Sequence, residues 1–235
     1  MGLARVLSKM GYCSRSQAAA LIRVGRVRHE GRIVRDPESP VRISQGRIEV
    51  DGLPLDRTPA VYLVMNKPRG VVTTASDEKQ RQTVYDLLEP DLPWVGPVGR
   101  LDKASEGLML LTNDSVWAAK VTHPSHHLDK KYHVQIDCVA NAELLAKITR
   151  VGSDHGPSAK RNSDESLRAK EVRLLRRGIK NSWLEITLDE GKNRQIRRLL
   201  EGMAVQVLRL VRVSIGPLEL GDLKKGSTRR LTSEE

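Results

Sequence analysis

Apolar residues near the N-terminus of the chain recur at the spacing of a helix. They predict a short amphipathic helix over Leu3–Met10, which Gly11 would end. A second helix is expected to begin behind Ser14, because Ser14 and Gln17 have the spacing of a capping box, and Gly25 stands where that helix would end. The residues that follow predict short strands in GRVRHEGRIV and QGRIEVDG. This segment is therefore expected to form a compact α+β unit.

The pattern changes after a predicted linker at Asp56–Pro59. The next residues predict a β-hairpin made of the runs VYLVMN and VVTT around the turn KPRG. Farther along, strands are predicted at Tyr132–Asp137, Trp183–Leu188 and Val207–Ile215, and helices at Thr83–Leu88, Ala142–Arg150 and Asn193–Gly202. The linker divides the chain into two predicted domains, residues 1–58 and 59–235. The polar stretch 152–166 in the second is expected to be an exposed, mobile loop.

Charge indicates the kind of partner that the chain binds. Its 235 residues carry a formal net charge of +11, and residues 1–60 hold 11 Lys and Arg against 6 Asp and Glu. This balance favours a polyanionic partner, because each neutralised phosphate releases counterions; a soluble protein that is merely basic is the alternative. No apolar run approaches the roughly 20 residues of a membrane span. Cys13 and Cys138 match neither a disulfide framework nor a zinc site, so we expect a cytoplasmic protein with reduced thiols and no membrane association.

Several common chemistries have no motif in this sequence. The stretch GDLKKGST lacks the lysine that a phosphate-binding Walker loop places before its Ser227. Three histidines, His123, His126 and His127, could bind a metal, but they have no cysteine or carboxylate partner at ligand spacing. We interpret them as a solvated loop and expect neither a metal nor a nucleotide cofactor.

A lone carboxylate in a basic loop is the first candidate for chemistry. Asp102 lies in VGPVGRLDKASEGLMLLTND, between Arg100 and Lys103. A carboxylate repels phosphate, so it is costly in a nucleic-acid groove unless it has a specific task. It could act as a nucleophile, as a general base, or as a turn residue paired with Arg100.

Two further stretches carry candidate residues. On a helix, EGKNRQIRRLL places Arg194 one turn from Arg197 and Arg198, where they could bind phosphate, hold a carboxylate ionised, or simply form a solvated basic face. In LDKKYHVQI, Tyr132 follows two lysines at the start of a strand. It could stack on a nucleic-acid base or be an ordinary strand residue.

Taken together and in order, these stretches resemble a known family. NKPRGVVTT, GRLDKASEGLMLLTND, THPSHHLDKKYHV and DEGKNRQIRRLLEGMAVQVLRLVRVSIGPL are similar to the motifs of ribosomal RNA pseudouridine synthases, in the subfamily typified by the small-subunit synthase A. The N-terminal GYCSRSQAAALIRVGRVRHEGRIVRDP resembles an S4 RNA-binding domain. The resemblance covers nearly the whole chain.

The resemblance implies an α+β fold, in which a mixed, largely antiparallel catalytic sheet with flanking helices follows a small N-terminal α+β S4-like domain. It implies an enzyme that isomerises a specific uridine of ribosomal RNA to pseudouridine without a cofactor, after the nucleotide flips out of its stack. The stretch GKNRQIRRL favours large-subunit RNA as the substrate. A monomer is the simplest expectation for the oligomeric state. The alternatives are a non-catalytic S4-type RNA chaperone or ribosome-assembly factor and, more distantly, a metal-dependent nuclease, which would need clustered carboxylates.

The resemblance also implies a role for each site residue. Asp102 would be the catalytic carboxylate, Tyr132 would stack on the uracil and relay its C5 proton, and Arg197 would pair with Asp102 to keep it charged. Arg100 would fill the space left by the flipped base and Arg194 would bind phosphate, while Leu199 or Leu200 would form the apolar wall under the base. The S4-like domain would supply sequence-tolerant affinity for RNA through Arg15, Arg23, Arg26 and Arg28. Of these, Arg15, Arg23 and Arg26 lie outside the apolar face of the predicted helix and are expected to be free to meet solvent or phosphate.

Overall fold

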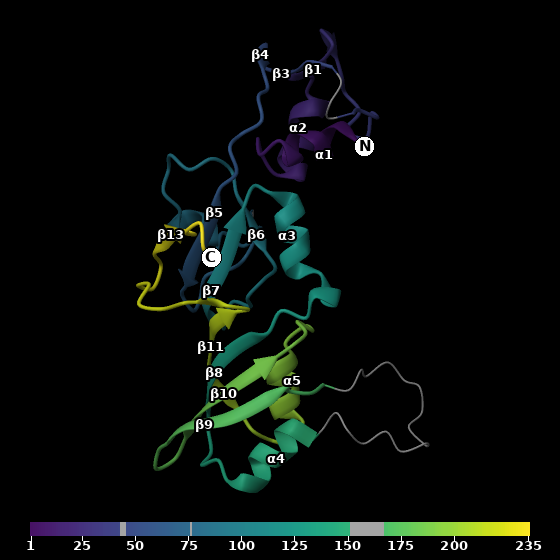
Figure 1. Ribbon diagram of the computed structural model, residues 1–235. Helices are drawn as coiled ribbons and strands as arrows, with labels where there is room; N and C mark the ends of the chain where they lie inside the picture. Colours follow the sequence, from purple (N-terminus) through teal and green to yellow (C-terminus); the bar gives the residue numbers. More distant parts are fainter. Residues whose placement is uncertain (43–45, 76, 151–166) are drawn as a thin grey trace, which may run out of the picture.

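The computed structural model describes residues 1–42, 46–75, 77–150 and 167–235. The molecule is elongated: a small N-terminal unit sits at one end, and one long sheet runs through the rest of the molecule (Figure 1). The expected loop 152–166 lies outside the described residues.

The N-terminal unit packs two helices against a small sheet. Helix α1 spans Leu3–Lys9 and α2 spans Arg15–Arg23, close to their predicted bounds. The predicted capping box is confirmed, because Gln17 N donates to Ser14 Oγ at 3.2 Å and Ser14 N donates to Gln17 Oε1 at 3.0 Å. The strands pair in the order β2-β1-β3-β4. Their bounds are Val27–His29 (β1), Arg32–Ile33 (β2), Ile48–Val50 (β3) and Leu53–Pro54 (β4).

The large sheet begins after the linker. Its main path has the order β13-β5-β7-β11-β8-β10-β9. Outside this path, β6 pairs with β7 and β12 pairs with β11. The strand bounds are Tyr62–Lys67 (β5), Gly96–Val98 (β6), Glu106–Thr112 (β7), Lys130–Ile136 (β8), Glu171–Arg177 (β9), Ser182–Leu188 (β10), Val207–Ile215 (β11), Leu218–Glu219 (β12) and Thr228–Arg230 (β13). All of these pairs are antiparallel except β7 with β11. The mixed, largely antiparallel α+β fold is therefore confirmed.

Helices cover the sheet and bury its core. Helix α3 (Ser115–Thr122) packs on the Leu108 and Leu110 side of β7, whereas Met109 and Leu111 belong to a separate cluster. Strand β7 is thus buried on both faces. In the other half, α5 (Gln195–Glu201) packs on β8, β10 and β11, and α4 (Ala142–Arg150) contacts β9 and the same core. In the part of the chain that the structure describes, no helix is both long and apolar enough to cross a bilayer.

One predicted element is wrong and two are modified. The VYLVMN run forms β5, but it does not pair with VVTT, because β5 is sandwiched between β7 and β13 and both of its edges are occupied. The predicted helix Thr83–Leu88 is a short 3₁₀ helix, η1, over Val84–Leu87. Helix α5 begins at Gln195, because Arg194 has a left-handed backbone conformation with φ of 50°.

Other predicted elements agree closely with the structure. Helix α4 and strand β11 have the predicted bounds, and β8 and β10 begin slightly before theirs. The division of the chain at residues 58 and 59 stays a prediction, although the two sheets lie on either side of it.

The parallel contact of β7 with β11 requires a glycine. Gly107 has φ of +100°, and a Cβ there would lie 2.2 Å from the carbonyl oxygen of Arg212. A side chain at this position would push the two strands apart, because neither backbone can yield by that much. The close approach fixes the start of β7, and the loop that carries Asp102 enters the sheet directly before it.

Candidate active site

Asp102 lies in the loop between β6 and β7, next to the centre of the sheet. Its side chain is 35% exposed, and its Oδ2 atom lies 3.8 Å from Nη1 of Arg194. The loop places a carboxylate at the surface of an otherwise basic region, and Arg194 is the residue that the structure pairs with it.

The backbone of this loop is held at every carbonyl from Leu101 to Ser105. The donors come from the segment 67–73, from Arg197 on α5 and from the loop itself, so the loop cannot shift without breaking several hydrogen bonds at once. The hydrogen bonds are Thr73 Oγ1 to Leu101 O (2.9 Å), Lys67 Nζ to Asp102 O (3.2 Å), Ser105 N to Asp102 O (3.0 Å), Gly70 N to Lys103 O (2.8 Å), Arg197 Nη2 to Ala104 O (3.1 Å) and Lys67 Nζ to Ser105 O (2.9 Å). Asp102 thus combines a rigid backbone with an accessible carboxylate, which is the arrangement that a reacting group needs.

Lys67 contributes two of these hydrogen bonds from the interior of the protein. It ends strand β5, it is 0% exposed, and its Nζ also donates to the carbonyl of Pro68 at 3.1 Å. Burial lowers the pKa of Lys67 to about 8, while the negative charges of Asp102 and Glu106 act in the opposite direction. Sequence reasoning missed this residue: a lysine at the end of an apolar strand looks like the beginning of a solvated turn.

Arg197 has a different role from the predicted one. The structure pairs Asp102 with Arg194, whereas the Nη1 and Nη2 atoms of Arg197 donate to the carbonyls of Val207 and Ala104 at 3.4 and 3.1 Å. Burial first, and then Arg194, lower the pKa of Arg197, and the charge of Asp102 opposes that shift. Arg197 therefore acts on Asp102 through the loop backbone and through its charge. The predicted direct pairing of Arg197 with the carboxylate of Asp102 is therefore wrong.

Tyr132 lies in the same row of the sheet as Lys67. Across four adjacent strands, Lys67 pairs with Gly107, Gly107 with Arg212, and Arg212 with Tyr132. Tyr132 is 9% exposed and belongs to the core cluster under α5. The register thus connects Tyr132 with the strand that follows the Asp102 loop. Its predicted stacking and proton-relay roles stay predictions.

The other predicted residues are divided between the core and the surface. Leu199 and Leu200 are 3% and 0% exposed and pack in the same cluster as Tyr132. Arg100 is exposed on the loop before Asp102. Arg194 and Arg197, which both contact this loop, also line a cavity of about 370 Å³ together with Glu201.

The predicted RNA-binding arginines of the N-terminal unit are all exposed, but one of them is paired within the protein. Arg15, Arg23 and Arg28 are exposed. The expectation that Arg26 is free is wrong: its Nε donates to Oδ1 of Asp51 at 2.7 Å, and the two side chains form an ion pair.

The histidine loop agrees with its interpretation as a solvated segment. His123, His126 and His127 are exposed. Among the described residues, no group of three or more His, Cys, Asp or Glu side chains could hold a metal ion.

Glu106 is a second charged residue that sequence reasoning missed. Its side chain is 2% exposed at the start of β7, where Arg209 donates through Nε and Nη2 at 3.1 and 3.0 Å and Lys225 forms an ion pair with the same carboxylate. Burial opposes the charge of Glu106, but Arg209 and Lys225 outweigh it and hold the pKa of the carboxyl below its usual range. This cluster joins β7, β11 and the segment before β13.

We expect Glu106→Gln to lower the free energy of unfolding by about 2 kcal/mol at pH 7, because hydrogen bonds to a buried charged acceptor are lost. The pKa of Glu106 is lower in the folded than in the unfolded chain, so its contribution is full above the unfolded value of 4.5 and is lost as the pH falls through the folded value. Urea unfolding at a series of pH values should show the difference shrinking below pH 4.5. A difference that is constant with pH would contradict the assignment. The exposed Glu219 provides the control, Glu219→Gln, with an effect within about 0.5 kcal/mol.

Comparisons with known proteins match this architecture. A family model described as RNA pseudouridylate synthase matches residues 61–202, and a model described as S4 domain matches residues 1–45. The ribosomal large subunit pseudouridine synthase B of Bacillus subtilis (strain 168) is 35% identical over 235 residues, covering 99% of this chain and 93% of that protein. An uncharacterized RNA pseudouridine synthase of Rickettsia prowazekii (strain Madrid E) is 35% identical over 238 residues, covering 99% of this chain and 94% of that protein.

A solved structure agrees with the sequence comparisons. A crystal structure of a pseudouridylate synthase superposes with a TM-score of 0.65 at 26% identity, covering 100% of this chain and 97% of that one. The similarity extends over the N-terminal unit and the whole of the large sheet, including the Asp102 loop. From the family match and the near full-length relatives, the chain belongs to the RNA pseudouridylate synthase family and is an RNA pseudouridine synthase with an S4 domain.

Proposed function

We propose that this enzyme isomerises a specific uridine of ribosomal RNA, in the large subunit, to pseudouridine. The proposal of the large subunit rests on the relative from Bacillus subtilis, whose name states that substrate. The observation that carries the catalytic part is the Asp102 loop, where a rigid backbone presents a partly exposed carboxylate beside Arg194. A non-catalytic RNA chaperone would have no need for such a group.

The reaction exchanges one glycosidic bond for another. The bond between N1 of the uracil and C1′ of the ribose breaks, and a bond between C5 and C1′ forms. C5 loses its hydrogen as a proton and N1 gains one, so atoms and charge balance without a cofactor. Asp102 acts at the ribose, either as nucleophile on C1′ or as a base on a ribose proton, and each role requires a carboxylate rather than a neutral side chain.

The surrounding residues would hold this carboxylate in place and bind the flipped nucleotide. Arg197 and Lys67 hold the loop, Arg194 balances the charge of Asp102, and Tyr132 stacks on the flipped uracil and relays the C5 proton. The buried side chains of Leu199 and Leu200 support the tyrosine from α5. Arg100 contacts the RNA where the base has left. We further propose that the enzyme is a cytoplasmic monomer.

Pseudouridine mapping tests this function. Carbodiimide-dependent primer-extension stops would be compared across both ribosomal RNAs from cells with and without the gene, and the purified protein would then be incubated with a transcript that contains the identified site. We expect one stop in large-subunit RNA to be missing from cells without the gene. The purified protein should then produce the same stop on the transcript without an added cofactor. A missing stop in small-subunit RNA would contradict the choice of subunit, and unchanged stops throughout would contradict ribosomal RNA as the substrate.

A further inference from the structure

The cavity that Arg194 and Arg197 line also contains an acidic residue. Its volume of about 370 Å³ lies within the range of roughly 300–1,000 Å³ that ligand sites have. Glu201 follows Arg197 by about one turn of α5, and residues 204–207 complete the lining. Helix α5 packs on the large sheet over the same core as Tyr132 (Figure 1). The cavity thus connects the two arginines that contact the Asp102 loop with a second carboxylate.

The carboxylate of Glu201 has no partner within the described part of the chain. Its side chain is exposed, and no hydrogen bond or ion pair joins it to another described residue. A carboxylate repels phosphate, so this part of the cavity does not suit the RNA backbone. An ionised carboxylate accepts hydrogen bonds through both of its oxygens. Glu201 therefore suits a ligand that donates hydrogen bonds and carries no negative charge.

Two other lining residues are held in place before any ligand binds. The guanidinium of Arg197 donates through Nη1 to Val207 O at 3.4 Å and through Nη2 to Ala104 O at 3.1 Å, which fixes its plane. Gln206 N donates to Asp137 Oδ1 at 2.9 Å, and Asp137 N donates to Gln206 O at 3.1 Å. A fixed guanidinium plane can stack on a flat ring, and the exposed amide of Gln206 offers both a donor and an acceptor. The cavity therefore suits a flat, polar ring.

A strained alanine also lines the cavity. Ala204 has φ of 57°, a left-handed conformation that favours glycine, and its N–H donates to Glu201 O at 3.0 Å at the end of α5. Ala204 is exposed, so its methyl group adds nothing to the core, but it lines the cavity. Contact of this methyl group with a ligand explains why alanine stands at a position where the backbone favours glycine.

The acidic residue is within reach of a base near the target uridine. Nη1 of Arg194 lies 3.8 Å from Oδ2 of Asp102. Glu201 lies roughly 10 Å from Arg194 along the helix axis, because each residue of a helix advances about 1.5 Å. Stacked nucleotides follow one another at about 3.4 Å along a strand. A base within a few positions of the uridine can therefore reach Glu201 while the uridine is at Asp102.

We propose that this cavity binds a guanine base close to the target uridine and thereby sets the sequence context of the reaction. The inference rests on the proposed function and deepens it by naming a feature of the substrate. Guanine carries two adjacent donors, N1–H and N2–H, which match the two oxygens of Glu201. Adenine and cytosine present one amino group on that edge, and uracil presents carbonyl oxygens that a carboxylate repels. The guanidinium plane of Arg197 and the methyl group of Ala204 contact the faces of the base.

Selection from a random pool of RNA tests the proposal. The probe is a pool of stem–loop RNAs with one fixed uridine in the loop and random nucleotides on both sides of it, and the RNA that the full-length protein binds is sequenced. We expect guanine to be enriched about tenfold at one position near the uridine. In Glu201→Gln the enrichment should fall to within about twofold, because the amide group of glutamine directs a donor at the donors of guanine.

Two further variants separate recognition from charge and from folding. Glu219→Gln, at an exposed position in β12, changes the net charge equally and should retain the enrichment. Ala204→Gly should weaken binding of the selected RNA about threefold without lowering the urea midpoint, because glycine suits the left-handed backbone. Enrichment of another base would overturn the proposal. So would a Glu201→Gln variant that binds all members of the pool more tightly with unchanged enrichment, since Glu201 would then only repel phosphate.

The selection measures binding and needs no isomerisation. Guanine enrichment that depends on Glu201, in a protein that leaves ribosomal RNA unmodified, would support the cavity and contradict only the proposed function. Isomerisation of ribosomal RNA by a protein that selects no guanine would confirm the proposed function and contradict only the cavity.

Discussion

Replacing Asp102 with asparagine is expected to stop the isomerisation of uridine and to leave RNA binding intact. Asparagine has the same shape, and every hydrogen bond that holds the loop is made by its backbone, so the loop conformation is retained. The variant lacks the carboxylate that would attack C1′ of the ribose or accept a ribose proton. We expect the rate to fall by more than about a thousandfold, as when a reacting carboxylate or base is removed.

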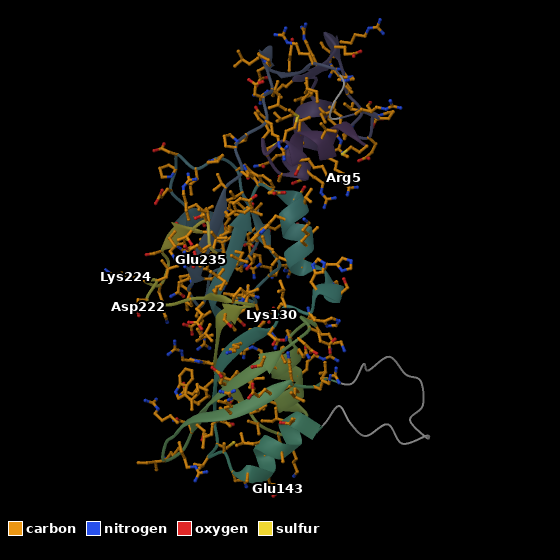
Figure 2. The ribbon with its side chains drawn as sticks, in the orientation of Figure 1. Arg5, Lys130, Glu143, Asp222, Lys224 and Glu235 are labelled. Carbon is orange, nitrogen blue, oxygen red and sulfur yellow. The ribbon has the colours of Figure 1, made fainter. Side chains whose placement is uncertain are left out.

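Release of tritium from RNA labelled at C5 of uridine measures this rate, because C5 loses its hydrogen when it bonds to C1′. The rate should be taken in single-turnover conditions and Kd measured on the same RNA. Asp222→Asn, at an exposed position in the loop after β12, provides the control and should retain the wild-type rate (Figure 2). An Asp102→Asn rate within about tenfold of wild type would exclude a reacting role, and a parallel loss of binding would indicate a role in RNA recognition instead.

Local patterns in the sequence predicted much of the fold. Helix α4 and strand β11 could be predicted at their observed bounds, because period and capping are set by neighbouring residues. The hairpin after β5 was wrong for a non-local reason. Strand β5 takes its partners from β7 and from β13, which lies near the C-terminus, and no local turn signal reports such pairings.

The site could be predicted only in part. The lone carboxylate in a basic loop and the family resemblance pointed to Asp102 and to the arginine helix, but the choice between Arg194 and Arg197 depended on where that helix begins. Because α5 starts at Gln195, Arg194 lies just before the helix, and its Nη1 atom lies 3.8 Å from Oδ2 of Asp102. The roles of Lys67 and Glu106 depend on burial in the centre of a sheet, which a single sequence does not reveal when the residue is charged.

Replacing Lys67 with methionine is expected to lower kcat about a hundredfold with little change in KM for RNA. Methionine fills the same volume but donates no hydrogen bond, so the carbonyls of Pro68, Asp102 and Ser105 lose Nζ. The loop then moves by a fraction of an ångström or more, and a displacement of this order in a reacting group costs about a hundredfold. Lys103→Met, on the exposed side of the same loop, is the matched control and should keep kcat within about threefold. Equal effects of the two variants would contradict a positioning role.

The pH dependence distinguishes positioning by Lys67 from a contribution to stability. The pKa of Lys67 is about 8 in the folded chain, below its ordinary value of 10.5. As the pH rises, the folded protein therefore releases this proton at a lower pH than the unfolded chain does. Between these pH values the unfolded chain binds more protons, and the free energy of unfolding contributed by this group therefore rises with pH. Catalysis should change in the opposite direction, because the neutral amine holds the carbonyls of Asp102 and Ser105 less tightly. We expect the wild-type kcat to fall above about pH 8 while urea unfolding shows no matching loss of stability. A kcat that stays constant to pH 9.5, or one that falls only as the protein unfolds, would show that the charge of Lys67 does not hold Asp102 in place.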